Sequence, residues 1–228
     1  MRDELTKEST EISQATIDPL FSEQLKNFTL RAIDGREFVR VKKMTEWLRS
    51  IDPETGMSHF RRLLQREVDF EEFLSYRRLF SEEPAERMDL TFCILLSIGQ
   101  GRLLNLFREH RVVDRTLPVS LSSLTTEFTR VDELPTKWRE IAEAFHKIQW
   151  KFIPVVFDVV SAHYTREFVL PIHKREPLTD QKGGTARLYH IEVLEEFLSS
   201  ELRHSIESSQ FDDKRDDLGP VSVRYSGV

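Results

Sequence analysis

The stretch 90–98 constrains the fold of this chain more than any other, because apolar side chains cover nearly every face of the helix that it would form. The residues concerned are Leu90, Phe92, Cys93, Ile94, Leu95, Leu96 and Ile98. A helix that is apolar all round is stable in water only when other elements surround it. The stretch is too short to cross a bilayer, which takes about 20 residues. We therefore predict a central, buried helix inside a helical domain.

Segments with one apolar stripe supply the surrounding helices. Between Asp34 and Asp52, apolar residues fall three or four positions apart, which predicts a helix that Pro53 ends. Further helices are predicted over 69–80, where Asp69 is a candidate N-cap, and over 138–148. The stretch 112–135 is rich in Ser and Thr, and we expect it to cross the surface without regular structure.

Charge and cysteine content exclude several classes of protein. Among the 228 residues, acidic side chains outnumber basic ones, and the formal net charge is −6. We predict no nucleic-acid binding, which needs clustered Lys and Arg. The single cysteine, Cys93, allows neither an internal disulfide nor a cysteine metal site. The first twenty residues lack the pattern of a signal peptide, so we expect an intracellular protein without membrane contact, in the cytoplasm or alternatively the nucleus.

The second half of the chain changes to patterns typical of strands. The segment 150–160 is aromatic and β-branched around Pro154, and we expect it to be extended. Apolar residues then alternate with others in three places: Phe168, Leu170 and Ile172; Tyr189, Ile191 and Val193; Val221, Val223 and Tyr225. The expected fold class is mainly α, a helical bundle followed by a small antiparallel β-sheet.

Three parts of the chain follow from these patterns. Residues 1–25 form a polar lead-in, and residues 26–160 form the helical domain. Residues 166–228 form the β segment. Within this segment the stretch 199–218 is rich in acidic residues and serine, and we expect it to be a mobile loop.

A pair of glycines, Gly183 and Gly184, precedes the strand that contains Tyr189. A plain turn between two strands would use the same residues. A glycine-tipped hairpin over a nucleotide would use them too, because glycines let backbone N–H groups approach phosphates closely.

The order of landmarks along the chain resembles that of fungal protein-kinase-like proteins, in which a long helical region precedes a protein kinase domain. The landmarks are Leu90-Thr-Phe-Cys-Ile-Leu-Leu-Ser-Ile-Gly, Asp114-Arg-Thr-Leu-Pro, Trp138 with Phe145, Gln149-Trp-Lys-Phe-Ile-Pro, and Leu170-Pro-Ile before the glycine pair. The resemblance spans roughly residues 86–225. It implies that the β segment is similar to an incomplete, truncated kinase N-lobe.

The resemblance also implies a vestigial nucleotide-binding loop. Its residues would be Gly183, Gly184, Thr185, Ala186 and Leu188, with Arg224 on the strand that normally carries a lysine. The family pattern is kept only in part. Gln181 and Ala186 stand where the loop has its first and third glycines, and arginine is not interchangeable with lysine in such a pocket.

Catalysis in the family needs a His-Arg-Asp and an Asp-Phe-Gly motif, and neither occurs in this sequence, which stops four residues after Arg224. We therefore expect no enzyme activity, no catalytic residue and no metal ligand. The expected function is that of a non-catalytic helical interaction or regulatory region attached to the kinase-like segment. One alternative is an ATP-binding fragment of a serine/threonine protein kinase, and another is a stand-alone helical scaffold unrelated to kinases.

No cofactor is expected under the first of these hypotheses, whereas ATP with Mg²⁺ is the ligand under the ATP-binding alternative. An unfinished sheet would leave unpaired edges and an apolar face. We therefore expect a protein partner, or self-association, through residues 166–193.

Overall fold

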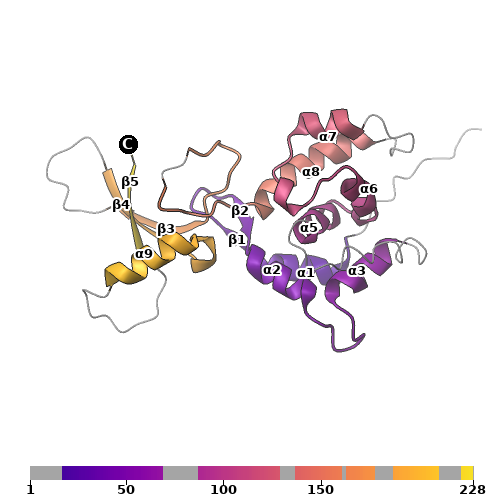
Figure 1. The fold of residues 1–228 in the computed structure, drawn as a ribbon, viewed down its shortest axis with the longest axis horizontal. Coiled ribbons are helices and arrows are strands. Elements are labelled where there is room, and N and C mark those ends of the chain that lie inside the picture. Colours follow the sequence, from indigo (N-terminus) through magenta and orange to yellow (C-terminus); the bar gives the residue numbers. More distant parts are fainter. Residues whose placement is uncertain are drawn as a thin grey trace, which may run out of the picture.

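The computed structural model describes residues 17–68, 87–128, 137–160, 163–177, 187–210 and 222–227. Residues 127, 187, 188, 209, 210 and 222–227 are described through their backbone alone. The molecule is elongated: a helical lobe lies at one end and a smaller sheet lobe at the other, with a β-hairpin and one further chain segment between them (Figure 1). Among the described residues, no helix combines the length and the apolar character that crossing a membrane requires.

The helical lobe is built from α-helices joined by short turns. They are α1 Pro19–Phe28, α2 Val41–Arg49, α3 His59–Glu67, α5 Asp89–Ser97, α6 Leu104–Glu109, α7 Leu121–Glu127 and α8 Trp138–Phe152, with 3-10 turns η3 Gly101–Leu103 and η4 Asp114–Thr116. Helix α5 is buried from Thr91 to Leu96, and Leu90 and Ile98 at the two ends of the apolar run are half-buried. The prediction of a central, buried helix at this place is confirmed, and α8 confirms the predicted helix over 138–148.

Several helix ends are closed by side chains close to them in sequence. The Asp18 carboxylate accepts hydrogen bonds from the backbone of Leu20 and Phe21 at the start of α1. Ser58 and Ser120 cap α3 and α7 in the same way. Helix α6 ends with Arg111 in the left-handed region, at a φ of 57°, while the Val112 N–H donates to Phe107 O. Local sequence therefore sets most of these boundaries.

A two-stranded hairpin stands where the sequence predicts the first part of a helix. Strands β1 Thr29–Arg31 and β2 Glu37–Val39 pair antiparallel, and Gly35 occupies the turn at a φ of 85°. The prediction of a helix from Asp34 is wrong up to Arg40, and α2 begins at Val41. The physical reason is the Asp34-Gly35 dipeptide, because glycine adopts the positive φ that a tight hairpin turn requires.

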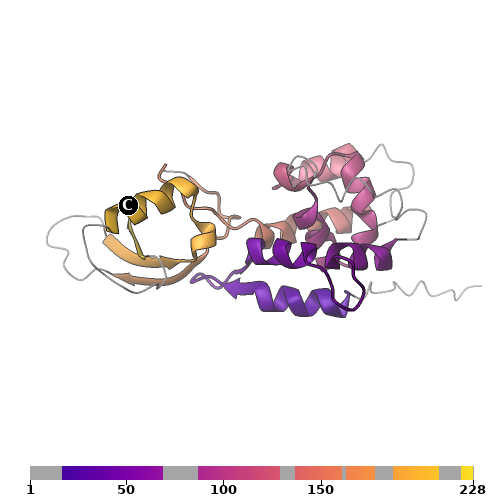
Figure 2. The same ribbon diagram turned by 60° about the horizontal axis from the view of Figure 1, so that its bottom comes forward.

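The sheet lobe is a three-stranded antiparallel sheet in the order β3-β4-β5. The strands are β3 Ile172–Pro177, β4 Arg187–Val193 and β5 Ser222–Gly227. A 3-10 turn, η6 Glu195–Phe197, and helix α9 Ser200–Gln210 follow β4 and lie beside the sheet (Figure 2). The predicted fold class is confirmed in its coarse form, a mainly helical chain with antiparallel β structure, although the structure has two small sheets instead of one.

Two hydrophobic cores meet at strand β2. The core of the helical lobe contains Val39, and the core of the sheet lobe contains its neighbour Phe38. Successive side chains of a strand point to opposite faces, so one short strand can enter both cores. The sheet core also takes Ala32 from the hairpin. The hairpin therefore belongs to both lobes and joins them.

Two other expectations for secondary structure need correction, and a third falls on residues that the structure does not describe. Helix α8 continues to Phe152, so residues 150–152 are helical where an extended segment is expected, because buried Gln149 and Phe152 tie this end of the helix to the core. Helix α7 lies inside the stretch 112–135, where no regular structure is expected. The predicted helix over 69–80 lies outside the described residues.

The expected mobile loop over 199–218 is replaced in its first part by helix α9. The Ser199 hydroxyl accepts a hydrogen bond from the backbone of Leu202, as an N-cap residue does. Leu202 and Ile206, four positions apart, pack against the sheet core. Residues 211–221 lie outside the described part of the chain.

Candidate functional site

The sheet lobe contains the positions that the sequence singles out for nucleotide binding. Gly183, Gly184, Thr185 and Ala186 lie outside the described residues, in the connection between β3 and β4. Leu188 lies in β4 and Arg224 in β5. In the register of these strands Arg224 pairs with His190, and Leu188 pairs with Ser226. Because positions alternate between the two faces of a sheet, 188, 190 and 224 share one face.

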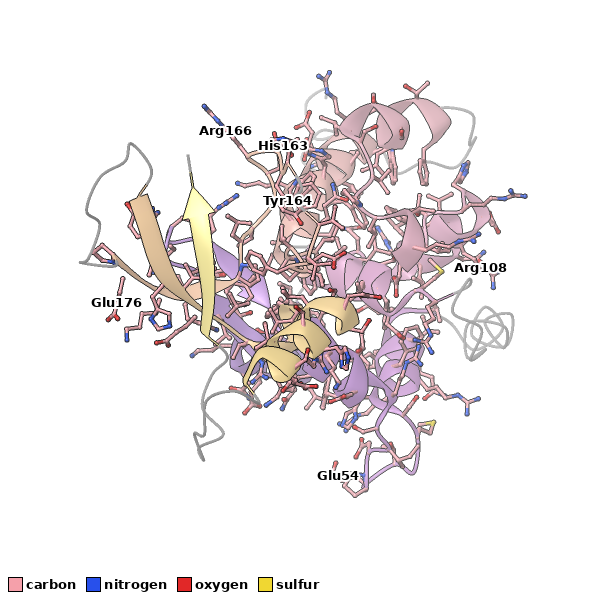
Figure 3. The ribbon with its side chains drawn as sticks, turned by 60° about the vertical axis from the view of Figure 1, so that its left-hand side comes forward. Glu54, Arg108, His163, Tyr164, Arg166 and Glu176 are labelled. Atoms are coloured by element: carbon pink, nitrogen blue, oxygen red, sulfur yellow. The ribbon has the colours of Figure 1, made fainter. Side chains whose placement is uncertain are left out.

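Charged side chains from β3 and β4 occupy the same face, which we call the polar face. Lys174 pairs with Glu192, and Glu176 pairs with His190, in the antiparallel register. The Lys174 ammonium group lies 3.0 Å from a Glu176 carboxylate oxygen and 3.2 Å from one of Glu192. Nδ1 of His190 lies 3.9 Å from the other Glu176 oxygen. Glu176 lies toward the end of β3 that is far from the helical lobe (Figure 3).

The polar face holds two carboxylates against one ammonium group among its described side chains. Hydrogen bonds and charge attraction from Glu176 and Glu192 raise the pKa of Lys174 above its ordinary value, so this amine stays protonated. Its charge is already neutralised by the two acids. A polyphosphate approaching these side chains would meet no net positive charge, which distinguishes them from a phosphate-binding cluster.

The opposite face of the sheet is apolar and covered. Tyr189, Ile191 and Val193 point into the sheet core, and Arg175 lies over the Tyr189 ring with its guanidinium carbon 3.5 Å from the ring centroid. Phe197 packs in the same core, together with the α9 side chains that follow it in sequence. The expectation that the sheet leaves an apolar face uncovered is therefore wrong, because side chains of η6 and α9 cover this face.

A second cluster of polar groups, which we call the junction cluster, lies where the hairpin meets the sheet lobe. Arg40, directly after β2, donates from Nε to Oε1 of Glu196 in η6 over 2.5 Å. His173 of β3 lies close enough to Arg40 to feel its charge, and its ring centroid is 5.7 Å from that of Phe38. Two buried atoms of this cluster, Nε2 of His173 and Oε2 of Glu196, have no hydrogen-bond partner within the described structure. No sequence motif indicates this cluster, because its members come from three separate segments.

The segment between the two lobes exposes apolar side chains. Val156, Val159, Val160 and Tyr164 are between 42% and 69% exposed. Figure 3 shows Tyr164 close to His163 and Arg166 at this connection. The backbone carbonyl of Arg166 accepts a hydrogen bond from Arg36 of the hairpin, so one side of the segment is fixed to the rest of the molecule.

Within the described ranges, no group of three or more His, Cys, Asp or Glu side chains is arranged to hold a metal ion. No protein-family model, curated protein or solved structure matches this sequence.

Proposed function

We propose that this chain is a non-catalytic interaction or regulatory module, in which a helical lobe is attached to a small sheet of the kind that begins a protein kinase domain. The observation that supports this most strongly is the strand register. An antiparallel sheet in the order β3-β4-β5 puts Leu188 and Arg224 on one face, and the glycine pair lies in the connection between its first two strands.

Two features favour interaction over catalysis. The 228 residues contain neither the His-Arg-Asp triplet that supplies a catalytic base nor the Asp-Phe-Gly triplet that holds the metal. The polar face carries two acidic side chains next to Lys174, an arrangement that disfavours bound polyphosphate.

The proposed partner surface includes residues 166–193, as the sequence suggests. Strand β3 is at the edge of the sheet, and an edge strand offers backbone groups to another chain. The charged side chains of Lys174 and Glu176 on this strand disfavour pairing with a second, identical edge, so we favour a different protein as partner.

ATP binding by the same sheet is the second candidate function, since Leu188 and Arg224 share a face. Thermal unfolding with and without ATP and Mg²⁺ distinguishes the two. A ligand present at 100 times its Kd would stabilise the protein by about 2.7 kcal/mol and raise the Tm, whereas the non-catalytic proposal predicts no change.

Two variants sharpen this test. If the Tm rises with ATP, Arg224→Ala should abolish the rise, and Lys147→Ala, which removes an exposed positive charge from α8, should leave it. Such a result would replace the proposed function by ATP binding. Transfer of labelled phosphate to the protein or to a generic substrate would overturn the non-catalytic assignment altogether.

A further inference from the structure

The contact between the hairpin and the sheet lobe is made by few groups, and each of them can be named. The Ile33 N–H donates to Ile172 O over 3.0 Å, and Arg36 donates to the carbonyl groups of Arg166 and Glu167. The ion pair of Arg40 and Glu196 completes the set, at the side where the hairpin leads into α2. Phe38, Ala32 and Leu30 add apolar contacts with the sheet core, so polar and apolar groups together hold the hairpin against the sheet lobe.

His173 lies inside this contact. Its ring packs near Phe38, and its Nε2 atom is buried without a hydrogen-bond partner in the described structure. A register shift in β3 between Ile172 and Lys174 sets this residue apart from the regular alternation of the strand. A neutral imidazole tolerates such a place better than a charged one, because a buried charge without a partner is costly.

The charged groups around His173 decide whether protonation of its imidazole is favoured or opposed. Arg40, which follows β2, repels an imidazolium ion, and Glu192 of β4 attracts it. Glu196 of η6 holds Arg40 through Oε1 and leaves its buried Oε2 without a partner, so the position of Arg40 beside His173 depends on this ion pair. Lys174, the next residue in β3, forms ion pairs with Glu176 and Glu192 on the polar face.

We propose that the contact between hairpin β1–β2 and the sheet lobe is a proton-sensitive lock, closed while His173 is neutral and released when its imidazole takes up a proton. Release would weaken the ion pair of Arg40 and Glu196 and loosen the hairpin from the sheet. The two lobes would then change their relative orientation, because the hairpin contributes Phe38 to one core and Val39 to the other.

The direction of the pH dependence follows from the surroundings of His173. Burial, followed by repulsion from Arg40, lowers the pKa of this histidine below its ordinary value, so the closed contact favours the neutral form. Because the pKa of His173 is lowered in the closed contact, the contact has its full stability at pH values above the pKa of a free histidine, where the imidazole is neutral in either state. That stability is lost as the pH falls below about 6.5, the pKa of a free histidine.

Amide hydrogen exchange of the full chain tests the lock, with rates corrected for the intrinsic effect of pH. The reporter is the Ile33 amide, whose hydrogen bond crosses from the hairpin to β3. We expect its protection to fall by up to ~tenfold per pH unit below pH 6.5. The Gly35 amide is the internal control, because its bond to Ala32 O stays within the hairpin and should remain protected.

Three variants decide whether His173 is responsible. His173→Phe cannot take up a proton and should keep the Ile33 amide protected at pH 5. His173→Arg carries a permanent charge and should leave that amide unprotected already at pH 7. His190→Gln removes the histidine of the polar face and should behave like the wild type. If His173→Phe loses protection on acidification as the wild type does, the lock is refuted.

A titration of the wild type by NMR covers the case in which the variants fail to fold. The imidazole signals of His173 should titrate below the pKa of a free histidine, together with the exchange rate of Ile33, and titration at or above that value would refute the lock. Neither experiment contains a nucleotide. Their outcome is therefore independent of whether the polar face binds ATP.

Discussion

The carboxylate of one residue, Asp114, caps the central helix α5 and thereby contributes to its stability. Helix α5 has Met88 at its N-cap, which offers no side-chain acceptor. The Asp114 carboxylate, from η4, supplies one: it accepts from the backbone of Leu90 over 3.1 Å and of Thr91 over 2.9 Å. The Thr91 hydroxyl donates to the same group. A residue distant in sequence therefore performs the capping that α1, α3 and α7 obtain locally.

The burial of Asp114 makes the stability of the protein depend on pH. Burial of Asp114 raises the pKa of its carboxyl to about 6, although the hydrogen bonds from Thr91 and Leu90 oppose the change. Since this pKa lies above that of the free side chain, the stabilising contribution is full at low pH and is lost as the pH rises through 6. A shift of this size corresponds to on the order of 3 kcal/mol.

We predict that Asp114→Asn removes this pH dependence. Between pH 4 and pH 7 the wild type should lose on the order of 3 kcal/mol relative to the variant, measured by urea unfolding at each pH. Asp158→Asn, which changes an exposed carboxylate between the lobes, is the matched control and should run parallel to the wild type. An Asp114→Asn protein with an unchanged pH profile would refute the assignment.

At the scale of elements, the hairpin β1–β2 connects the two hydrophobic cores. Strand β2 has only three residues, and two of them are fully buried in different cores. On the helical side Lys151 of α8 reaches Glu37 of the same strand over 2.9 Å. Neighbouring side chains of any strand point to opposite faces. In β2 this local property connects parts of the chain that are distant in sequence.

Substitutions of Phe38 and of Val39 should each destabilise a different lobe. Phe38→Ala should lower the exchange protection of the Ile191 and Val193 amides, with a cost of about 3–5 kcal/mol for a buried phenylalanine. Val39→Ala should instead lower protection in α5, by roughly 1.5–3 kcal/mol, the value of a buried valine side chain. Each variant is the control for the other. Equal losses in both lobes from either change would show that the two cores unfold as one unit.

At the scale of the whole molecule, the two cores differ greatly in size. Within the described residues, 24 buried apolar residues form the core of the helical lobe and eight form that of the sheet lobe. Because hydrophobic stabilisation grows with the apolar area removed from water, the smaller core should be the less stable of the two.

We therefore predict that urea unfolds the sheet lobe first. The NMR signals of the Ile191 and Val193 amides should disappear at a lower urea concentration than the change in tryptophan fluorescence. All three tryptophans, Trp47, Trp138 and Trp150, lie in helices of the helical lobe and report on it. Coincident midpoints for both probes would instead indicate a single cooperative transition.

Several elements of this fold could be predicted from the sequence, because their signals are local. The apolar run of α5 required a buried helix, the stripe of α8 predicted an amphipathic one, and the alternation around Tyr225 predicted the last strand. The hairpin was missed although Asp34-Gly35 indicates it, since the spacing of Phe38 from α2 also fits a helix. Helix α9 was missed because acidic residues and serines outweighed the pair Leu202 and Ile206.

The sequence by itself determined that α5 is apolar all round, that α8 has an apolar stripe and that side chains alternate along β4. Only the tertiary structure decided what meets those faces: α9 covers the sheet, Asp114 caps α5, and Arg40 pairs with Glu196 across 156 positions. Periodicity arises from bonds between neighbours along the chain, and so it can be found in a short window. Contacts between distant segments arise only when the whole chain folds, and the burial that changes the pKa of His173 and of Asp114 arises with them.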